Sequence, residues 1–232
     1  MSTSTLAKDS TAIITGAAGF LGRHTLCRLA AAGYRVAGLA RTRPAWWDGC
    51  QERLFEADLQ QAGTFEEICR SVAQPVTLVH LAARLPASAV ALDDTGVAAH
   101  NRLIDDHVLR VCQRLRIPVV YASTCSVYGR SGTLPHTEEA APNHPIPYVA
   151  EKLDAEQLGM EWLGGEGIPF TALRISAPYG PAHQARTVMN IFIERALEGE
   201  PLLYHGSGSR QQDFVFATDV ADAIRLALDR GV

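Results

Sequence analysis

Runs of aliphatic and β-branched residues alternate along the chain with segments in which apolar residues recur at helical spacing. Alternation of this kind is typical of a parallel sheet whose strands are joined by crossover helices. The predicted strands lie near Ala12–Thr15, Arg35–Leu39, Arg53–Glu56, Thr77–His80, Pro118–Ala122 and Pro169–Ile175. The predicted helices between them lie near Phe20–Ala32, Thr64–Val72, Val97–Leu115 and Tyr148–Leu163. The pattern therefore indicates an α/β protein with a doubly wound parallel sheet.

Shorter and less regular segments replace these long runs toward the C-terminus. The pattern there predicts, in order, a helix at Ala185–Leu197, a short strand at Leu202–Tyr204, a glycine-rich turn and a last helix from about Asp219. We therefore expect residues 1–175 to form the main domain. Residues 176–232 are expected to form a smaller part, some of whose elements return to the main sheet.

A glycine-rich turn lies between the first predicted strand and the first predicted helix. It reads Gly16-Ala-Ala-Gly19-Phe-Leu-Gly22. Glycines let the backbone approach a pyrophosphate, and the helix N-terminus adds amide donors and the positive end of its dipole. Glycines also form turns without a ligand, but the strand before and the helix after favour a dinucleotide site. Asp58-Leu59, after the third strand, is placed either to receive an adenine amino group or to cap the strand.

The end of the second predicted strand bears on the choice of cofactor. An acidic residue about 20 positions past the glycines commonly binds the ribose 2′-hydroxyl of NAD. This chain has Arg41-Thr42-Arg43 at that place and no carboxylate. A guanidinium can bind a 2′-phosphate through two hydrogen bonds, so Arg41 favours NADP over NAD. The other interpretation is a solvated basic loop beside an NAD site.

Three side chains supply candidate chemistry. Tyr148 and Lys152 are four residues apart on one predicted helix, so they lie on the same face. A nearby ammonium favours the phenolate and lowers the pKa of a tyrosine, which makes Tyr148 a candidate acid–base group. Thr124 ends the fifth strand, at the edge where open α/β sheets bind ligands. Separately, each of these features fits an ordinary helix or turn, but their combination indicates a catalytic site.

Several sequence motifs follow one another across nearly the whole chain. They are TGAAGFLG, ADL at Ala57–Leu59, VHLAA at Val79–Ala83, YASTCSVYG, YVAEK, RISAPYGP at Arg174–Pro181 and DFVFATDVADAI at Asp213–Ile224. Together they resemble the extended short-chain dehydrogenase/reductase family, and within it the NAD-dependent epimerase/dehydratase type that is similar to UDP-galactose 4-epimerase. The resemblance implies a Rossmann fold with strand order 3-2-1-4-5-6 and a cofactor across the point where that order reverses.

The resemblance also implies roles for individual residues. Thr124, Tyr148 and Lys152 match the catalytic triad, and Lys152 would also hold the nicotinamide ribose. Asn101 falls where relatives have a helix asparagine that supports this lysine. Together with the residues already named, the predicted cofactor contacts are Gly16, Gly19, Phe20, Leu21, Gly22, Arg41, Asp58, Leu59, Leu81, Ala82, Ala83, Asn101 and Lys152. Ser126 and Arg210 are assigned to the substrate.

The chain departs from the family pattern at four points. Cys125-Ser126 stands where dehydratases carry an Asp-Glu pair and sugar-acid decarboxylases a Glu, which disfavours both activities. Ala177 replaces an asparagine, and Gln212 an arginine, that commonly contact a nucleotide sugar. Arg210 could substitute for that arginine or be only a loop charge. The family usually continues past the last predicted helix, so the C-terminal substrate-binding part is expected to be incomplete.

These observations favour an NAD(P)-dependent oxidoreductase of the epimerase/dehydratase family. It would act at a secondary alcohol or ketone of a sugar-like substrate, which could be a nucleotide sugar. Tyr148 would exchange the hydroxyl proton while Thr124 hydrogen-bonds the same oxygen. The alternative is an NADPH-dependent ketoreductase of a non-nucleotide substrate, because Arg41 favours NADPH; the sequence leaves both open. The third alternative is a dinucleotide sensor without activity, although such proteins typically lack an intact Tyr-Lys pair.

Composition bears on the expected binding partners and on the cellular compartment of the protein. The hydrophobic fraction of 47% can fill a sizeable core, and the net charge of -4 gives no indication of a nucleic-acid partner. No segment approaches the ~20 apolar residues of a membrane span. The five scattered cysteines show no metal-ligand spacing and predict no disulfide framework, no metal site and a cytoplasmic location. Relatives pair the helices near Val97–Leu115 and Tyr148–Leu163 across a two-fold axis, which implies a homodimer.

Overall fold

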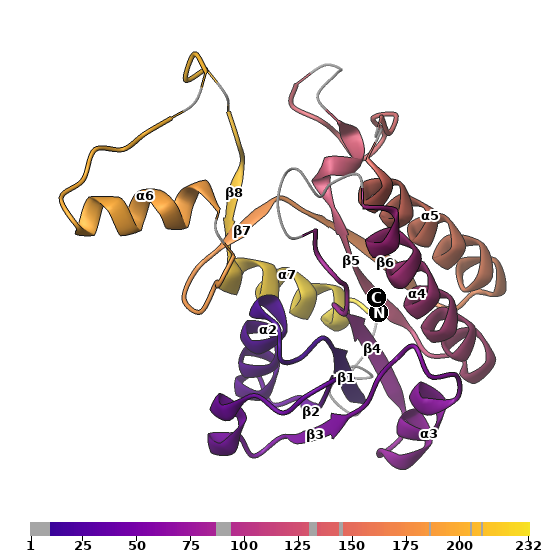
Figure 1. Ribbon diagram of the computed structural model, residues 1–232. Helices are drawn as coiled ribbons and strands as arrows, with labels where there is room; N and C mark the ends of the chain where they lie inside the picture. Colours follow the sequence, from indigo (N-terminus) through magenta and orange to yellow (C-terminus); the bar gives the residue numbers. More distant parts are fainter. Residues whose placement is uncertain are drawn as a thin grey trace.

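Six parallel strands form the main sheet, in the order β3-β2-β1-β4-β5-β6 (Figure 1). The computed structural model describes residues 10–86, 94–129, 134–143, 146–185, 187–204, 206–209 and 211–232. The strands are β1 (Thr11–Thr15), β2 (Arg35–Ala40), β3 (Arg53–Glu56), β4 (Val76–His80), β5 (Val119–Thr124) and β6 (Phe170–Ile175). The predicted doubly wound sheet and its strand order are confirmed.

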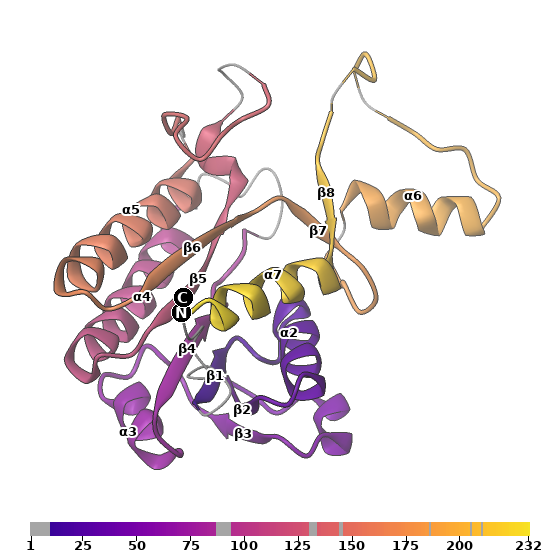
Figure 2. The ribbon, with the colours of Figure 1, turned by 180° about the vertical axis from the view of Figure 1, so that it is seen from behind.

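Helices cover both faces of this sheet. They are α2 (Phe20–Ala31), α3 (Thr64–Ser71), α4 (Thr95–Leu115), α5 (Pro147–Trp162) and α7 (Ala217–Asp229). Helix α6 (Val188–Leu197) projects away from the sheet (Figure 1), and 3-10 turns form at η1 (Ala45–Gly49), η3 (Cys125–Tyr128) and η4 (Gly164–Glu166). Figure 2 shows α2 and α7 on one face and α3, α4 and α5 on the other. In the described part of the chain, no helix has both the length and the apolarity that crossing a membrane requires.

The core follows from the alternation of side chains along the strands. Ile13 packs in a cluster with residues of α3, α4 and α5, whereas its neighbour Ile14 packs in a second cluster with residues of α2 and α7. Successive side chains of a strand point to opposite faces, so a strand buried on both faces is apolar throughout. Gly33 follows α2 at φ +83 and terminates it, as the sequence predicts.

The last helix belongs to the main sheet rather than to the projecting C-terminal segment. Ile224 and Leu228 of α7 are buried in the same cluster as residues of α2. Two polar links reinforce this packing: Arg28 is paired with Asp222 at 2.6 Å, and the Tyr34 hydroxyl donates to Asp229. Of the C-terminal elements, α7 is therefore the one that packs on the main sheet.

The segment between β6 and α7 differs from the prediction in three ways. Residues 201–204 form no strand, and the side chains of Leu203 and Tyr204 are exposed, because no strand among the described residues pairs with this apolar run. Two three-residue strands that the pattern did not indicate, β7 (Ala177–Tyr179) and β8 (Phe214–Phe216), form a small parallel sheet instead. Helix α6 begins at Val188 rather than near position 185, because the Thr187 side chain caps it by accepting the Asn190 N–H at 3.3 Å.

Candidate functional site

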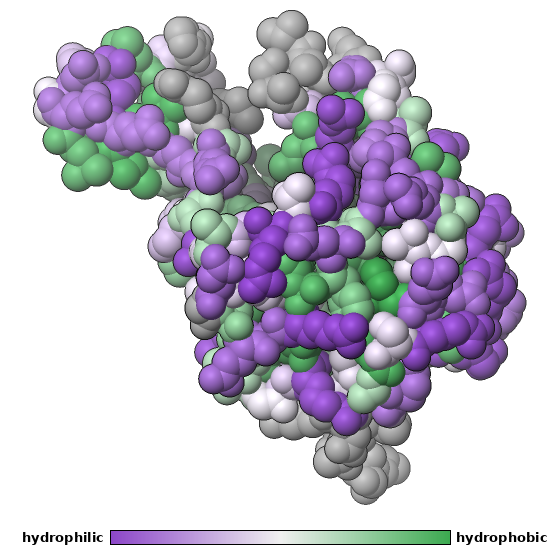
Figure 3. Space-filling model, turned by 60° about the horizontal axis from the view of Figure 1, so that its bottom comes forward, coloured by the Kyte–Doolittle hydropathy of each residue, from purple (hydrophilic) through white to green (hydrophobic). Residues whose placement is uncertain are grey.

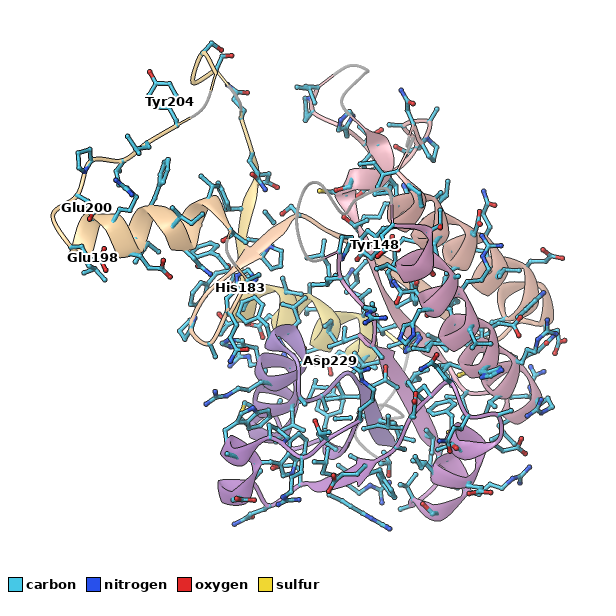
Figure 4. The ribbon with its side chains drawn as sticks, viewed as in Figure 1. Tyr148, His183, Glu198, Glu200, Tyr204 and Asp229 are labelled. Carbon is cyan, nitrogen blue, oxygen red and sulfur yellow. The ribbon has the colours of Figure 1, made fainter. Side chains whose placement is uncertain are left out.

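The carboxyl ends of the central strands open into a cleft of about 2460 Å³. One side is built by the sheet and α5, and the other by the β7–α6 connection. Figure 4 shows Tyr148 on the first side and His183 on the second. The cleft lies where the strand order reverses, between β1 and β4, which is the expected ligand position in an open α/β sheet.

The glycine turn after β1 lines this cleft and has no room for a side chain at Gly16 or Gly22. Gly16 has φ +68, and a Cβ there would lie 2.9 Å from the backbone of Ala82. A Cβ on Gly22 would lie 2.1 Å from the carbonyl oxygen of Gly16. Gly19 caps α2 without a side chain, so the first N–H groups of the helix have no side-chain partner. Gly16, Gly19, Phe20, Leu21 and Gly22 all line the cleft.

The loops after β2 and β3 form the end of the cleft expected to hold the adenosine. Arg41 lines the cleft and is exposed, whereas Arg43 pairs with Asp48 at 3.0 Å. Asp58 and Leu59 also line it. Asp58 accepts the backbone N–H of Gln60 at 3.0 Å, so it caps the turn as well as facing the cleft.

The segment after β4 is held by two buried side chains. The N–H groups of Leu81 and Ala82 each donate to the Thr15 hydroxyl at 3.2 Å. The Asn101 amide accepts the N–H of Arg84 at 2.7 Å and donates to its carbonyl oxygen at 3.0 Å. Leu81, Ala82 and Ala83 line the cleft, but Asn101 lies behind them and does not. The structure thus gives Asn101 a role in supporting this segment.

The three candidate catalytic residues reach the same cleft from β5 and α5. Thr124, Tyr148 and Lys152 all line it, as does Ser126. The Thr124 hydroxyl oxygen accepts the N–H of Ser126 at 3.2 Å, which leaves its own proton available to an acceptor in the cleft. Lys152 is only 3% exposed, and its Nζ donates to the Tyr121 hydroxyl at 2.8 Å.

The electrostatics of Tyr148 differ from the expectation of a lowered pKa. Burial is the largest effect, and it raises the pKa of Tyr148. The Lys152 ammonium lowers this pKa, whereas the carboxyl groups of Glu151 and Asp105 raise it further. The net direction is upward. In the free chain, Tyr148 is therefore a protonated phenol at neutral pH that can donate a hydrogen bond.

A buried polar chain behind the cleft was not predicted. The Tyr121 hydroxyl donates to Asp105 at 2.5 Å, and His80 Nε2 lies 2.9 Å from the other oxygen of the same carboxylate. His80 Nδ1 lies 2.6 Å from the Thr15 hydroxyl. Asp105 follows Asn101 by four residues and precedes Val108 by three, so helical spacing places a carboxylate on the buried face. That spacing is the signal that could have revealed it.

A second polar cluster, also not predicted, lines the cleft beside η3. Arg174 of β6 donates to Glu156 of α5 at 2.7 Å and to the Tyr128 hydroxyl at 2.7 Å. The Ser123 hydroxyl donates to the same Glu156 carboxylate. Hydrogen bonding to Glu156 is the main cause that raises the pKa of Arg174. The cluster fixes β6, α5 and η3 to one another at the cleft wall.

Two positions at which the chain departs from the family pattern lie between β6 and α7. Ala177 and Gln212 line the cleft, which places both departures from the family pattern where a substrate would be bound. Arg210 lies outside the described residues. Within the described ranges, no group of three or more His, Cys, Asp or Glu side chains could hold a metal ion.

Comparisons with known proteins agree with this geometry. A model of the NAD dependent epimerase/dehydratase family matches residues 12–232. A probable UDP-glucuronate 4-epimerase from Rhizobium meliloti is 25% identical over 91% of the chain and 66% of its own length. A dTDP-glucose 4,6-dehydratase from Xanthomonas campestris is 26% identical over 96% of the chain and 68% of its own length.

A solved structure gives the same result at the level of the fold. The UDP-glucose 4-epimerase of Thermus thermophilus, solved in complex with NAD, has a TM-score of 0.81 and 29% sequence identity. The alignment covers 94% of this chain and 74% of that structure. The chain therefore spans about two thirds of the length of the curated relatives described above.

Proposed function

We propose that this chain, which belongs to the NAD dependent epimerase/dehydratase family, binds a nicotinamide dinucleotide in its cleft and acts on a secondary alcohol or ketone of a sugar-like substrate. One observation carries the proposal: Thr124, Tyr148 and Lys152 line the same cleft as the glycine turn. The relatives are named as enzymes of nucleotide sugars, which supports a nucleotide-sugar substrate. Residues 1–175 would bind the cofactor, and residues 176–232 would contribute to the substrate site.

The residues of the cleft fit a dinucleotide. The backbone at Gly16 and Gly22 excludes side chains, which lets a pyrophosphate approach the uncapped start of α2. Asp58 and Leu59 would contact the adenine, and Lys152 would contact the nicotinamide ribose; all three line the cleft. When bound, the dinucleotide would supply hydride-transfer chemistry.

The chain's own residues would handle the proton. Tyr148 would exchange a proton with the substrate hydroxyl, and Thr124 would donate a hydrogen bond to the same oxygen. The Lys152 ammonium would stabilise the phenolate that forms when Tyr148 gives up its proton. Cys125 and Ser126 offer no carboxyl group beside Thr124, so the cleft lacks an acidic pair there to expel water. This favours an epimerase over a dehydratase.

A second candidate is an NADPH-dependent ketoreductase of a non-nucleotide substrate. The observation that favours it is Arg41, which lines the cleft and is exposed while Arg43 is engaged with Asp48. A free guanidinium at this place suits a 2′-phosphate. On this basis NADP is the preferred cofactor of the proposal, and NAD the alternative.

The identity of a cofactor that co-purifies with the protein tests the proposal. Native mass spectrometry of protein purified without added cofactor should find a dinucleotide or show binding of an added one. Tightly bound NAD+ supports the epimerase, whereas weak binding that requires added NADPH supports the ketoreductase. Failure to bind any of NAD+, NADH, NADP+ and NADPH would contradict the proposed function.

We also propose that α4 and α5 form the interface of a homodimer. Val97, Ile104, Val108 and Val111 of α4 face the core, so the interface would use the outer faces of the two helices. Arg102 of α4 and Asp154 of α5 already pair on these faces. Light scattering at several concentrations tests the proposal, because a monomer at every concentration would contradict it.

A further inference from the structure

Two carboxyl groups and one amine are buried together behind the catalytic wall of the cleft. Asp105 of α4 is 1% exposed, Glu151 of α5 is 2% exposed, and Lys152 is 3% exposed. The two helices pack side by side over β4 and β5 (Figure 1). Burying one charge is costly unless an opposite charge offsets it, so the protonation of all three groups is linked.

The hydrogen bonds around Asp105 define the charge on that residue. The Thr15 hydroxyl accepts two backbone N–H groups, so its own proton goes to His80 Nδ1. His80 is then the neutral tautomer that carries its proton on Nε2 and donates it to Asp105. Tyr121 donates to the other oxygen of the carboxylate. Asp105 therefore receives two donors and is ionised.

Glu151 has the opposite environment. Among the described residues, neither of its buried carboxyl oxygens has a hydrogen-bond partner. Burial, and next the negative charge of Asp105, raise the pKa of Glu151 to about 9, and Lys152 only partly opposes them. Burial also disfavours the charged form of Asp105, but Lys152 and His80 bring the pKa of Asp105 below its usual range. One carboxyl group is thus charged and the other neutral.

We propose that Asp105 and Glu151 form a carboxyl pair that carries one negative charge between them, and that this charge holds Lys152 as an ammonium beneath Tyr148. The cluster is then electrically neutral, with the proton on Glu151 and the charge on Asp105. Either carboxyl group can carry the charge when the other is replaced. Both are positioning residues, since they act on the reaction through Lys152.

The groups that face the pair come from every packed element. They are His80 of β4, Tyr121 of β5, Arg102 of α4, and Tyr148 and Lys152 of α5. Of these, only Lys152 is a cation without a carboxylate partner of its own in the described structure, because Arg102 pairs with Asp154. The single negative charge of the carboxyl pair therefore offsets the positive charge of Lys152. The inference rests on the proposed function in one respect, namely that Lys152 acts in catalysis. Its test needs no substrate.

The chain allows a direct test because Lys8 and Lys152 are its only lysines. In protein labelled with 15N-lysine, nuclear magnetic resonance of the two Nζ groups reports the charge of Lys152, with Lys8 as the internal control. We expect an ammonium signal at neutral pH in wild type, Asp105→Asn and Glu151→Gln. In the double variant the proton affinity of the buried amine should fall about tenfold or more, because no counter-charge remains.

A second measurement uses stability and remains available if the double variant does not fold. In the folded chain Glu151 keeps its proton up to about pH 9, whereas an ordinary glutamate loses it near 4.5. Folding therefore takes up a proton between these values, and stability falls as pH rises. The unfolding equilibrium constant of wild type, relative to that of Glu151→Gln, should rise up to tenfold per pH unit in this window.

Two variants complete the stability test. Glu161→Gln makes the same chemical change at an exposed position of α5 and should keep the wild-type pH dependence. Asp105→Asn should lose the dependence, because Glu151 then ionises beside Lys152. A neutral Glu151 in Asp105→Asn, or a proton affinity of Lys152 in the double variant equal to that in wild type, would overturn the carboxyl pair. Neither result affects the proposed function, which is tested by cofactor binding.

Discussion

The two sides of the cleft are built in different ways. The body, which consists of the described residues from 10 to 175 together with α7, buries every residue of β1 and β4. The lobe, which consists of the described residues between 177 and 216, has only half-exposed strands, and its helix α6 contains no buried residue. Figure 3 shows apolar side chains along one edge of the projecting lobe. Tertiary packing therefore buries the body far more completely than the lobe.

The difference extends to the groups that line the cleft. On the body side, Lys152 and Tyr121 belong to a hydrogen-bonded chain that continues to the first strand. On the lobe side, His183 stacks on Phe20 with ring centroids 4.3 Å apart. The Asn190 amide donates to the carbonyl oxygen of His183 at 3.0 Å. The body side of the cleft is thus held by buried hydrogen bonds, and the lobe side by a ring contact with α2 and a hydrogen bond within the lobe.

The largest expected effect lies on the body side, at Tyr148. Tyr148→Phe removes the phenolic oxygen and leaves the ring, the helix and Lys152 in place. If this oxygen transfers the proton, turnover should fall by about 10²–10⁴-fold on a verified substrate. Cofactor affinity should hardly change, because the glycine turn and Lys152 are intact. Steady-state kinetics and cofactor titration measure the two effects separately.

Lys152→Met is the companion to this experiment. It should reduce both turnover and cofactor affinity, because it removes the proposed ribose contact and the charge that favours the phenolate. A dinucleotide sensor without activity predicts that neither wild type nor Tyr148→Phe turns over a substrate, and that Tyr148→Phe leaves dinucleotide binding unchanged. Full turnover by Tyr148→Phe would refute the assignment of Tyr148 as the acid–base group.

The next effect concerns the stability of the body. Leu109 of α4 is fully buried in the cluster beneath α3, α4 and α5. Leu109→Ala removes buried methyl groups and leaves a cavity, which should lower the free energy of unfolding by about 2–5 kcal/mol. Urea unfolding followed by circular dichroism gives this value. A loss of less than about 1 kcal/mol would mean that the site can collapse, contrary to the dense packing of the body.

The same contrast explains which parts of the fold the sequence could predict. The bounds of β1 and β4 are within one residue of the prediction, because burial on both faces leaves a largely apolar run in each strand. The bounds of β3 are as predicted, although its two end residues are exposed. Residues 202–204 carry a similar apolar run but are exposed, and local sequence cannot tell which apolar run has a neighbouring strand. Strands β7 and β8 are three residues long, too short for a periodic signal.

The site shows the same limit. Tyr148, Lys152 and the glycine turn could be predicted because they follow one another in recognisable local patterns. For Asp105, helical spacing could indicate a buried carboxylate but not its partners, since His80 and Tyr121 come from β4 and β5 and only the strand order brings them together. The effect of Lys152 on Tyr148 was predicted with the correct sign, but its size relative to burial required the structure.

A smaller effect is expected at Arg41, on the exposed rim of the body. If Arg41 binds a 2′-phosphate, Arg41→Ala should weaken NADPH binding by roughly 1.5–3 kcal/mol and leave NADH binding nearly unchanged. Arg43→Ala is the matched control, because Arg43 is paired with Asp48. Isothermal titration with both cofactors gives the four affinities. Equal losses for NADPH and NADH in Arg41→Ala would contradict the preference for NADP.

The smallest effect is expected in the lobe, where the Leu109 substitution has a matched counterpart. Leu197 ends α6 and is 83% exposed, so Leu197→Ala removes the same atoms from solvent rather than from a core. We expect a change in the free energy of unfolding within about 0.5 kcal/mol, and unchanged cofactor binding. Urea unfolding of the two variants side by side measures the contrast directly. A loss as large as that of Leu109→Ala would show that Leu197 is covered in solution, and the lobe would then be as dependent on tertiary packing as the body.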